Sequence, residues 1–487
     1  MLLGLDIGTT NVKAVLVEED GRVVARGSAP VRLIHVENGG VEQDTEEILS
    51  ATLGAIAQAG SSADLSAVEA VGVSSQGGAL QILDESGRPL GRAISWLDAR
   101  GDRHNERITR EIGSAELARR TGHPRGTMAL GQLLRLREEH AELLAGHNRI
   151  SFVGDVIVSR LCGRRAHDAT SLSCAVLLNP STGSVDQDMM ERVGIVEAQL
   201  PELLSAREPA GGLLEAMARR TSLPAGIPVS PAVHDQYAAA LGVGATAAGD
   251  VMFGAGTAWV LLAVSDRLMM PAAGIGFVCA HVVEGLYGQI LSMVNGGSAV
   301  SWAMELTGLD GVSHEGIDDM LESVQAGSDG LRFWPLLVPA GGAGVARGMP
   351  GRLAGLRLLH GRAHVLRAVV EGLAMELVRY LGLLSDVGAA AERIIMCGGA
   401  AASRVTPQII ADATGLPVEC AAESNTSAFG AAMIGRGLLE PGTALAGISE
   451  RMVPPARLLE PGPNAGLYQG IAEQYAASLP MQRAEQR

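Results

Sequence analysis

Apolar residues alternate with polar ones, or form short blocks, along the first part of the chain. Residues 2–6 form an apolar block, residues 12–18 alternate, and residues 23–26 continue after the turn Glu19-Asp20-Gly21. This pattern predicts three strands, followed by a helix over 45–59 that Asp44 or Thr45 can cap. Two further strands are predicted over 68–73 and 79–83. Strands therefore interleave with helices, which is typical of the α/β class.

A tight glycine-threonine turn occurs twice, each time between two apolar strands. Asp6-Ile7-Gly8-Thr9-Thr10 precedes the strand 12–17, and Gly254-Ala255-Gly256-Thr257-Ala258 precedes a predicted strand over 259–264. A lone Gly-Thr pair is a common turn, but Gly8 and Gly256 lie about half a chain length apart. The repetition predicts a duplicated domain, with a boundary in the Gly/Ala-rich stretch 242–249.

The net charge and the cysteines indicate which partners the protein can bind and in which cellular compartment it is expected. The net charge is −15, which argues against binding to nucleic acid or to an anionic membrane. Five scattered cysteines fit reduced thiols rather than zinc or disulfides. The start of the chain lacks the features of a signal peptide, and its longest uncharged stretch contains several polar residues. We expect a cytoplasmic protein.

The two turns have the chemistry of phosphate-binding loops. Successive backbone N–H groups of a Gly-Thr turn converge on one point, and glycine lets a phosphate approach closely. We expect Gly8, Thr9, Thr10, Gly256 and Thr257 to hold ATP phosphates, with threonine hydroxyls as further donors. Asp6 is expected to hold Mg²⁺, through water, because this ion dehydrates reluctantly.

A third glycine-rich turn follows the apolar block 393–396 and precedes a helix predicted over 406–414. Its residues are small, so a base or ribose can lie against the backbone at a helix start. We expect an adenosine site here, although a Gly-Gly pair between strand and helix is usually only a turn. The predicted residues are Gly398, Gly399, Ala400 and Ser403.

These motifs together resemble those of the FGGY carbohydrate kinases, within the actin-like ATPase superfamily. The most specific match is the stretch 351–371, which is similar to the family's C-terminal signature. The other matching segments are the two Gly-Thr turns, 72–76, 96–100, 234–236, 333–335 and 398–399. The resemblance implies two ribonuclease-H-like domains with an interdomain cleft. It implies a sugar-binding N-terminal domain over 1–243 and an ATP-binding domain over 244–440. The extension 441–487 is expected to contain a terminal helix near 467–479.

The same resemblance assigns roles to single residues. Asp235 matches the catalytic base; the alternative is a carboxylate that caps the helix predicted over 237–241, and the two roles are compatible. Trp96, Asp98 and Arg100 alternate, so they share one face if the segment is extended. They are expected to bind the substrate; the alternative is a packed Trp beside an ion pair. The remaining expected contacts are Gln76 and Gln236 for substrate hydroxyls, and Asn425, where relatives often have Glu, for the nucleotide.

The chain departs from its relatives in two loops. Gly77-Gly78 replaces an Arg-Glu or Met-His pair, and the segment 338–344 replaces a Gly-Glu-Arg-x-Pro loop. The loss of side-chain volume at Gly77-Gly78 leads to the hypothesis that a larger or differently oriented polyol is admitted.

The resulting prediction is an ATP-dependent kinase acting on a hydroxyl of a small sugar or polyol. A ketopentose such as xylulose is favoured, ATP and Mg²⁺ are the expected cofactors, and a homodimer is allowed. Two alternatives stay open at this point. One is an actin-like ATPase clamp, and the other is a catalytically altered kinase that senses a sugar or nucleotide.

Overall fold

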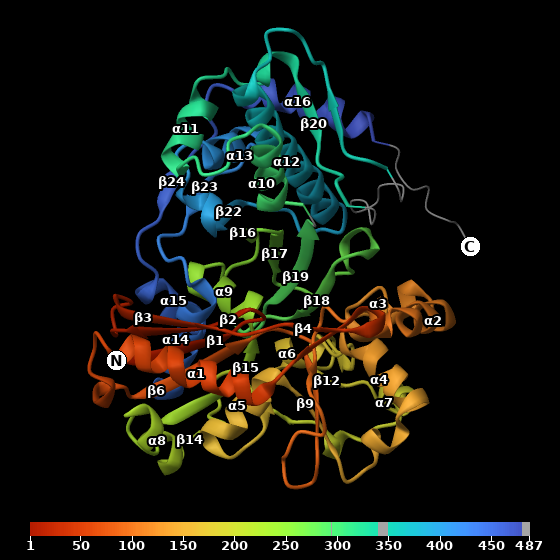
Figure 1. Ribbon diagram of the computed structural model, residues 1–487, viewed down its shortest axis with the longest axis vertical. Coiled ribbons are helices and arrows are strands. Elements are labelled where there is room, and N and C mark those ends of the chain that lie inside the picture. Colours follow the sequence, from red (N-terminus) through yellow and green to blue (C-terminus); the bar gives the residue numbers. More distant parts are fainter. Residues whose placement is uncertain (294, 339–348, 480–487) are drawn as a thin grey trace. The chain divides into compact units, whose positions relative to one another are not determined.

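The computed structural model describes residues 1–293, 295–338 and 349–479, and it divides into two compact units (Figure 1). The first unit comprises Met1–Ala247, Asp266–Gly288 and Asn425–Pro454, and the second comprises Ala248–Ser265, Gln289–Ser424 and the chain from Pro455 onward. One unit boundary therefore falls inside the stretch 242–249. The units interleave along the chain, whereas the sequence-based division used contiguous segments. Most of the altered loop 338–344 lies outside the described residues.

A mixed sheet of eight strands forms the centre of the first unit. Its main order is β13-β10-β15-β6-β1-β2-β3, with β14 paired to β15. β1, β2 and β3 are the three predicted strands and pair antiparallel, while β6, β15, β10 and β13 follow in parallel. The strands are β1 (Leu2–Ile7), β2 (Asn11–Val17), β3 (Val23–Pro30), β6 (Ala70–Ser75), β10 (Ala166–His167), β13 (Glu202–Leu203), β14 (Gly211–Gly212) and β15 (Pro228–His234).

A five-stranded sheet and several helices complete the first unit. The strand order is β4-β5-β8-β7-β9, with β4 (Ile34–Val36), β5 (Gly40–Gln43), β7 (Leu80–Leu83), β8 (Ala93–Ile94) and β9 (Arg149–Phe152). β11 (Leu178–Asn179) pairs with β12 (Ser184–Val185), and β18 spans Phe277–Ala280. The helices are α1 (Thr45–Gly60), α2 (Asp102–Ile112), α3 (Ser114–Thr121), α4 (Ala129–Glu139), α5 (Val153–Cys162), α6 (Ala169–Ser173), α7 (Gln187–Val193), α8 (Glu215–Thr221), α9 (Asp235–Val243), α14 (Thr426–Leu439) and α15 (Leu445–Met452).

The second unit repeats the central arrangement of the first. β16 (Asp250–Ala255) pairs antiparallel with β17 (Trp259–Ser265) and parallel with β22 (Arg393–Cys397), as β1 pairs with β2 and β6. The predicted repetition of a strand–turn–strand element is therefore confirmed. Its sheet has the order β19-β17-β16-β22-β23-β24, where β19 is Tyr287–Met293, β23 is Val418–Cys420 and β24 is Arg457–Leu459.

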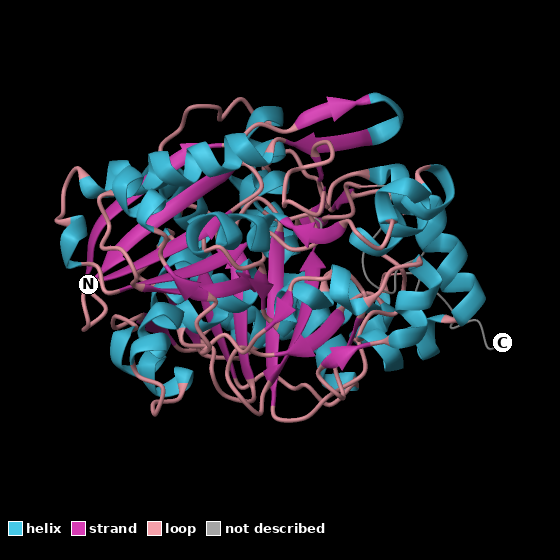
Figure 2. Cartoon of the chain, turned by 90° about the horizontal axis from the view of Figure 1, so that it is seen from below, coloured by secondary structure: helices cyan, strands magenta, loops and turns pink. Residues whose placement is uncertain are grey.

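Helices lie beside strands along the chain (Figure 2), and in the second unit α12 and α13 contact strands. The terminal helix is α16, displaced by two residues from its predicted range, and the helix predicted over 406–414 is α13. A hairpin of β20 (Arg332–Trp334) and β21 (Arg352–Ala354) lies beside α12. The helices are α10 (Gly297–Leu306), α11 (His314–Glu322), α12 (Arg362–Asp386), α13 (Thr406–Thr414) and α16 (Ala465–Ala477).

Two faces of the first unit's main sheet are packed differently. On one face, apolar side chains of β1 and β2 form a core with α1 and α5. On the other face, α14 lies directly on β1 and β6. A Cβ added at Gly4 would stand 1.8 Å from the carbonyl oxygen of Ala428, and one at Gly72 would stand 1.7 Å from that of Ala431. Glycine is therefore required on β1 and β6, because backbone meets backbone there.

The contact between α14 and α9 also requires glycine where the two backbones meet. A Cβ at Gly430 would lie 1.7 Å from the carbonyl oxygen of Ala238, and one at Gly242 would lie 2.3 Å from that of Thr426. Gly430→Ala should therefore force the two helices apart and lower the free energy of unfolding by about 1–3 kcal/mol or more. Urea unfolding followed by circular dichroism measures this loss.

A matched control is Gly382→Ala, in the interior of α12, where an added Cβ meets nothing within 4 Å. Here alanine should be neutral or stabilising by about 0.5–1 kcal/mol, since glycine is the poorer helix former. Equal stability changes in the two variants would contradict the close-packing argument.

Candidate functional site

Three parallel strands of the first unit end at one edge of the sheet, and polar residues gather there. β1 and β6 align so that Asp6 lies beside Ser74, and β6 and β15 align so that Ser75 lies beside His234. Asp235 follows His234 directly as the first residue of α9. Because β1, β6 and β15 are parallel, Asp6, Ser74 and Asp235 come from the same end of neighbouring strands.

Asp6 is a buried carboxylate with a strongly shifted pKa. Ser74 Oγ donates a hydrogen bond to Asp6 Oδ1 at 3.2 Å. Burial, and after it the charge of the nearby Asp235 carboxylate, raise the pKa of Asp6 to about 7, although Lys13 and Ser74 act in the opposite direction. A carboxyl group held in this way can bind a cation or hold a proton near neutral pH.

Asp235 is the second carboxylate at this edge. Its side chain is 26% exposed. Burial nonetheless raises its pKa to about 6, against hydrogen bonds from Gln236 and the charge of Lys13. Helix α9 begins at Asp235, two residues before the helix predicted over 237–241, and its N-cap residue is His234. Asp235 is thus in the first turn of α9, where the helix dipole favours its ionised form.

His234 separates the end of β15 from Asp235. Its Nε2 lies 3.6 Å from Asp235 Oδ1, which is beyond hydrogen-bond distance. Burial lowers the pKa of His234 to about 4, so the imidazole is neutral at pH 7. Within the described part of the chain, its Nδ1 has no hydrogen-bond partner. The ring packs edge-on against Tyr237 and Phe277, so its role in the structure is packing.

Lys13 is a residue of this site that the sequence reasoning missed. It lies on β2 opposite Asp6, and its charge lowers the pKa of both Asp6 and Asp235. Lys13 is also the only lysine in the chain. The signal was available, because the alternation along 12–18 places residue 13 on the polar side of a strand that leads out of the first Gly-Thr turn.

The first Gly-Thr turn is connected to the expected substrate residues. Trp96 Nε1 donates to Thr9 Oγ1 at 3.0 Å, and the Thr9 hydroxyl donates to Gln76 Oε1 at 3.1 Å. The only hydroxyl hydrogen of Thr9 is thus used inside the protein, so the expected hydroxyl donation from this residue to phosphate is not available in this arrangement. Trp96 is 44% exposed, whereas Gln76 is buried.

The segment 96–100 differs from the extended conformation that placed three side chains on one face. It turns at Trp96 and Leu97, and Asp98 then caps a short 3₁₀ helix by accepting from the Arg100 N–H. Both oxygens of Asp98 accept hydrogen bonds: Oδ2 from Val41 N–H at 2.9 Å, and Oδ1 from Gln132 Nε2 at 3.1 Å. The extended premise is wrong because these distant donors, together with the Arg100 guanidinium, fold the carboxylate inward.

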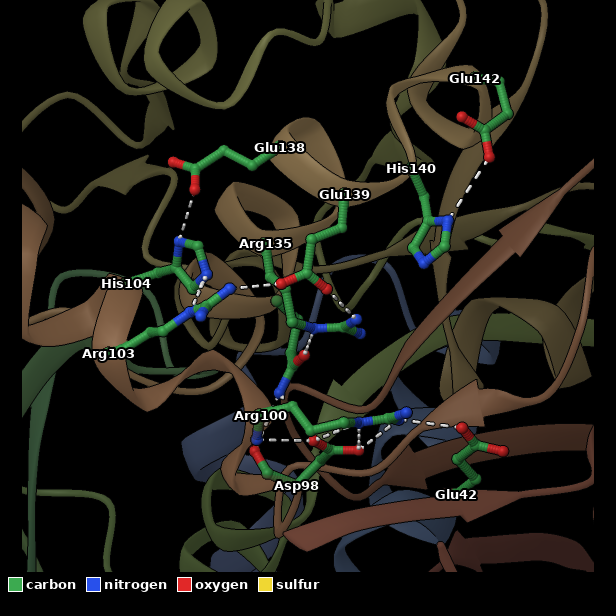
Figure 3. A network of polar contacts seen from close by, with 11 residues as sticks. Glu42, Asp98, Arg100, Arg103, His104, Arg135, Glu138, Glu139, His140 and Glu142 are labelled. Atoms are coloured by element: carbon green, nitrogen blue, oxygen red, sulfur yellow. Dashed lines mark hydrogen bonds and ion pairs between the residues drawn. The ribbon is translucent and has the colours of Figure 1, made fainter. Parts of the chain in front are cut away.

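Asp98 and Arg100 belong to a larger network of polar side chains (Figure 3). Arg100 Nη2 also bonds to Glu42 at 2.9 Å. On the other side, Gln132 accepts from Arg135 Nε at 3.0 Å, and Arg135 pairs with Glu139. Figure 3 shows this chain of contacts running from Asp98 to Arg135 and Glu139, which both belong to α4. The network holds the segment that carries Trp96.

The volume expected to open at Gly77-Gly78 is already filled. A Cβ at Gly77 would stand 2.4 Å from His234 Cδ2 and 2.5 Å from Cys174 Sγ. Gly78 has φ +73°, and a Cβ there would stand 2.9 Å from Met128 Cβ. The hypothesis of a wider pocket is therefore wrong for Gly77. Neighbouring side chains occupy the space that a larger residue would need.

The second Gly-Thr turn and the Gly-Gly turn are adjacent in the second unit. A Cβ at Gly398 would meet the backbone of Ala255 at 2.9 Å, and Gly398 has φ +87°. The carbonyl oxygens of Gly256 and Thr257 accept from the first N–H groups of α10 at 3.0 Å. The turn around Gly256 is thereby held between α10 and β22.

The expected adenosine residues divide between the units. Gly398, Gly399 and Ala400 lie in the short helical turn after β22. Ser403 Oγ accepts from the N–H groups of Val405 and Thr406 at the start of α13. Asn425 precedes α14 and is counted with the first unit. The structure thus brings four of the five predicted residues together in one unit.

Comparison with known proteins gives matches along nearly the whole chain. Residues 1–242 match the N-terminal domain of the FGGY family of carbohydrate kinases, and residues 253–436 match its C-terminal domain. L-fuculokinase of Salmonella typhi is 28% identical over 442 residues, covering 89% of this chain and 92% of that protein. Xylulose kinase of Bacillus subtilis (strain 168) is 25% identical over 435 residues, covering 89% and 87%.

The fold is shared with solved structures of such kinases. The crystal structure of xylulose kinase from Rhodospirillum rubrum matches with a TM-score of 0.89 and 26% identity, covering 98% of this chain and 97% of that chain. That of Plasmodium falciparum glycerol kinase with ADP, at 18% identity and a TM-score of 0.89, has the same fold. The two-unit α/β fold is thus that of actin-like ATPases, as predicted. Over the part of the chain that is described, no helix is long and apolar enough to cross a membrane.

The family match, which covers residues 1–242 and 253–436, favours a kinase over an actin-like clamp. Residues from both halves of the chain contribute to it, and the repeated turns and the signature 351–371 all fall inside the matched ranges. The chain therefore belongs to the FGGY family of carbohydrate kinases, enzymes that transfer phosphate to a hydroxyl group of a sugar.

Proposed function

We propose that this kinase uses ATP to phosphorylate a hydroxyl of a small sugar or polyol, with Asp235 as the general base. The observation that carries the proposal is the pair of carboxyl groups Asp6 and Asp235, whose pKa values are both raised by burial, with the chain's only lysine beside them. A ketopentose such as xylulose is the favoured acceptor. This choice is supported by the 26% identity to a solved xylulose kinase and by the xylulose kinases among the curated relatives.

Asp235 suits the role of a base for a sugar hydroxyl. Its pKa of about 6 leaves it mostly ionised at pH 7, yet more basic than an ordinary aspartate. The carboxylate accepts the hydroxyl proton as the oxygen attacks the γ-phosphorus of ATP. Because the His234 imidazole is neutral, it adds no positive charge that would lower the pKa of Asp235 and weaken it as a base.

The residues of the first unit also fit a magnesium ion. Across the residues that the structure describes, no group of three or more His, Cys, Asp or Glu side chains could enclose a metal. Mg²⁺ does not need such a cage, since it keeps several waters and binds through one or two carboxylates and substrate phosphates. Asp6 would hold it through water. When bound, the ion neutralises charge on the phosphates.

Backbone groups would hold most of the ATP. In this proposal the N–H groups of Thr9 and Thr10 bind phosphate in the first unit, and those of Gly256 and Thr257 bind phosphate in the second. The Gly8 N–H already donates to the carbonyl oxygen of Asn11 at 3.1 Å, so Gly8 would contribute by letting the phosphate approach closely. Lys13 adds a positive charge close to Asp6. The adenosine set is the predicted one: Gly398, Gly399, Ala400, Ser403 and Asn425.

The acceptor would contact Trp96, Asp235 and Gln236. Trp96 is partly exposed, and an aromatic face suits the C–H surface of a sugar. The polar groups of Asp98, Arg100 and Gln76 bond to other groups of the protein, so these residues would hold the Trp96 segment in place rather than contact the sugar. This revises the direct contacts expected of these three residues.

The first test is a coupled assay of ADP release with Mg-ATP over a panel of ketoses, aldoses and polyols. ADP release should depend strictly on an added acceptor. Asp235→Asn should lower transfer by about 10³-fold, since it removes the proton acceptor, while nucleotide affinity measured by calorimetry stays within about twofold. The control is Asp64→Asn, at an exposed capping position, which should keep wild-type activity. Sugar-independent ATP hydrolysis, or full activity of Asp235→Asn, would refute the proposal.

The pH dependence of transfer provides a second test. With the pKa of Asp235 raised to about 6, kcat/KM should rise with pH through about 6 and level off above it, because only the ionised carboxylate accepts the proton. The free energy of unfolding should instead fall as the pH rises. The raised pKa values of Asp6 and Asp235 stabilise the fold at acid pH, and this contribution is lost as pH rises through 6 to 7. A flat rate profile between pH 5 and 8 would argue against Asp235.

The single lysine provides a third test. An amine-acylating reagent has only Lys13 and the N-terminal amine to modify. Mg-ATP should slow acylation of Lys13, as followed by peptide mass spectrometry, without protecting the N-terminus. Lys13→Ala should lower transfer by about 100-fold through loss of a phosphate-binding charge, and Lys13→Arg should recover part of it. Full activity after complete acylation of Lys13 would exclude this role.

A further inference from the structure

A closed ring of hydrogen bonds joins the first Gly-Thr turn to β5 and β6. The Thr9 hydroxyl donates to Gln76 Oε1 at 3.1 Å, and Gln76 Nε2 donates to Gln43 Oε1 at 3.0 Å. Gln43 Nε2 then donates to the carbonyl oxygen of Thr9 at 2.8 Å. Trp96 is attached from outside, since its Nε1 donates to Thr9 Oγ1 at 3.0 Å.

Two groups with a fixed hydrogen-bonding role, the carbonyl oxygen of Thr9 and the indole N–H of Trp96, determine the direction of every bond in this set. The carbonyl oxygen of Thr9 can only accept, so the Gln43 amide must turn its NH₂ group toward it. Gln43 Oε1 therefore faces Gln76 and receives its NH₂ group, which turns Gln76 Oε1 toward the Thr9 hydroxyl. That hydroxyl must then donate to Gln76, which leaves its lone pairs for Trp96, whose indole N–H can only donate.

Burial makes this order of donors and acceptors hard to change. Gln43 is 0% exposed and Gln76 is 3% exposed, so water does not readily replace either amide as a partner. A flipped amide at Gln43 would set two oxygens against each other in the interior, which leaves buried polar groups unpaired. The orientation of Gln43 thus decides whether Thr9 offers Trp96 an acceptor.

From this geometry we infer that Gln43 is a positioning residue for the acceptor sugar, acting through Gln76 and Thr9 on Trp96. Gln43 itself contacts neither substrate in this scheme. It holds the Thr9 hydroxyl as an acceptor, and this hydroxyl anchors the indole to the phosphate loop. Trp96 then meets the sugar with its ring rather than its N–H. The inference rests on the proposed function, because it assigns the sugar to the side of Trp96.

The inference is tested with Gln43→Leu, which keeps the side-chain size and removes the amide. The KM of the panel sugar that wild type phosphorylates fastest, with D-xylulose assayed first, should rise by about tenfold. The KM of ATP should stay within about twofold, because the backbone N–H groups of the turn are unchanged. Trp96→Phe, which keeps an aromatic ring but lacks the N–H, should also raise the KM of the sugar.

A double-mutant cycle separates positioning from general structural damage. If Gln43 acts through the Trp96 N–H, then Gln43→Leu in the Trp96→Phe background should raise the KM of the sugar by less than about twofold further. The matched control is Gln81→Leu. Gln81 is an equally buried glutamine of β7 that bonds to the carbonyl oxygens of Ile82 and Gly91. This variant should lose stability but keep both KM values within about twofold.

The outcomes distinguish this inference from the proposed function. Additive effects of Gln43→Leu and Trp96→Phe would overturn the inference, as would an equal rise in the KM of ATP or the same result for Gln81→Leu. The proposed function fails on a different observation, namely a wild-type protein whose ADP release does not depend on any added sugar.

Discussion

The backbone of α14 lies directly against the backbones of β1 and β6, and the site residues of the first unit depend on that contact. β1 leads into Asp6 and the first Gly-Thr turn, and β6 leads into Gln76. Gly4 and Gly72 allow the helix to approach, because any side chain at either position would overlap a carbonyl oxygen of α14. Such contact leaves little freedom for the strands to shift. The strand ends are therefore held in register, and with them the groups that would meet phosphate and sugar.

Rigid strand ends explain how two carboxylates can be enclosed at one sheet edge. Burying a carboxylate is costly, and the raised pKa values of Asp6 and Asp235 record that cost. A flexible site would relax by admitting water. Here Ser74 and the single cation Lys13 offset only part of the penalty. In the proposed function, a bound magnesium ion would supply further positive charge beside these carboxylates.

The sequence was sufficient for features that depend on neighbours along the chain. Alternating and apolar blocks predicted β1, β2 and α13, and the repeated Gly-Thr turns predicted the duplicated strand–turn–strand element. Features set by distant residues were not predictable. Asp98 turns inward because Gln132 donates to it, and Gly77 is glycine because His234 and Cys174 occupy the space beside it. The roles of Lys13 and Gln43 likewise emerge only when separate strands are placed side by side.

The position of α14 in the chain has a consequence for how the protein is made. The helix that covers β1 and β6 is encoded by residues 426–439, so more than 400 residues must leave the ribosome before the first strand is covered. At ordinary synthesis rates this takes about 20–90 s. During that time one face of the N-terminal sheet is available to water, to other chains or to chaperones. The first unit begins folding early but is among the last parts of the molecule to be completed.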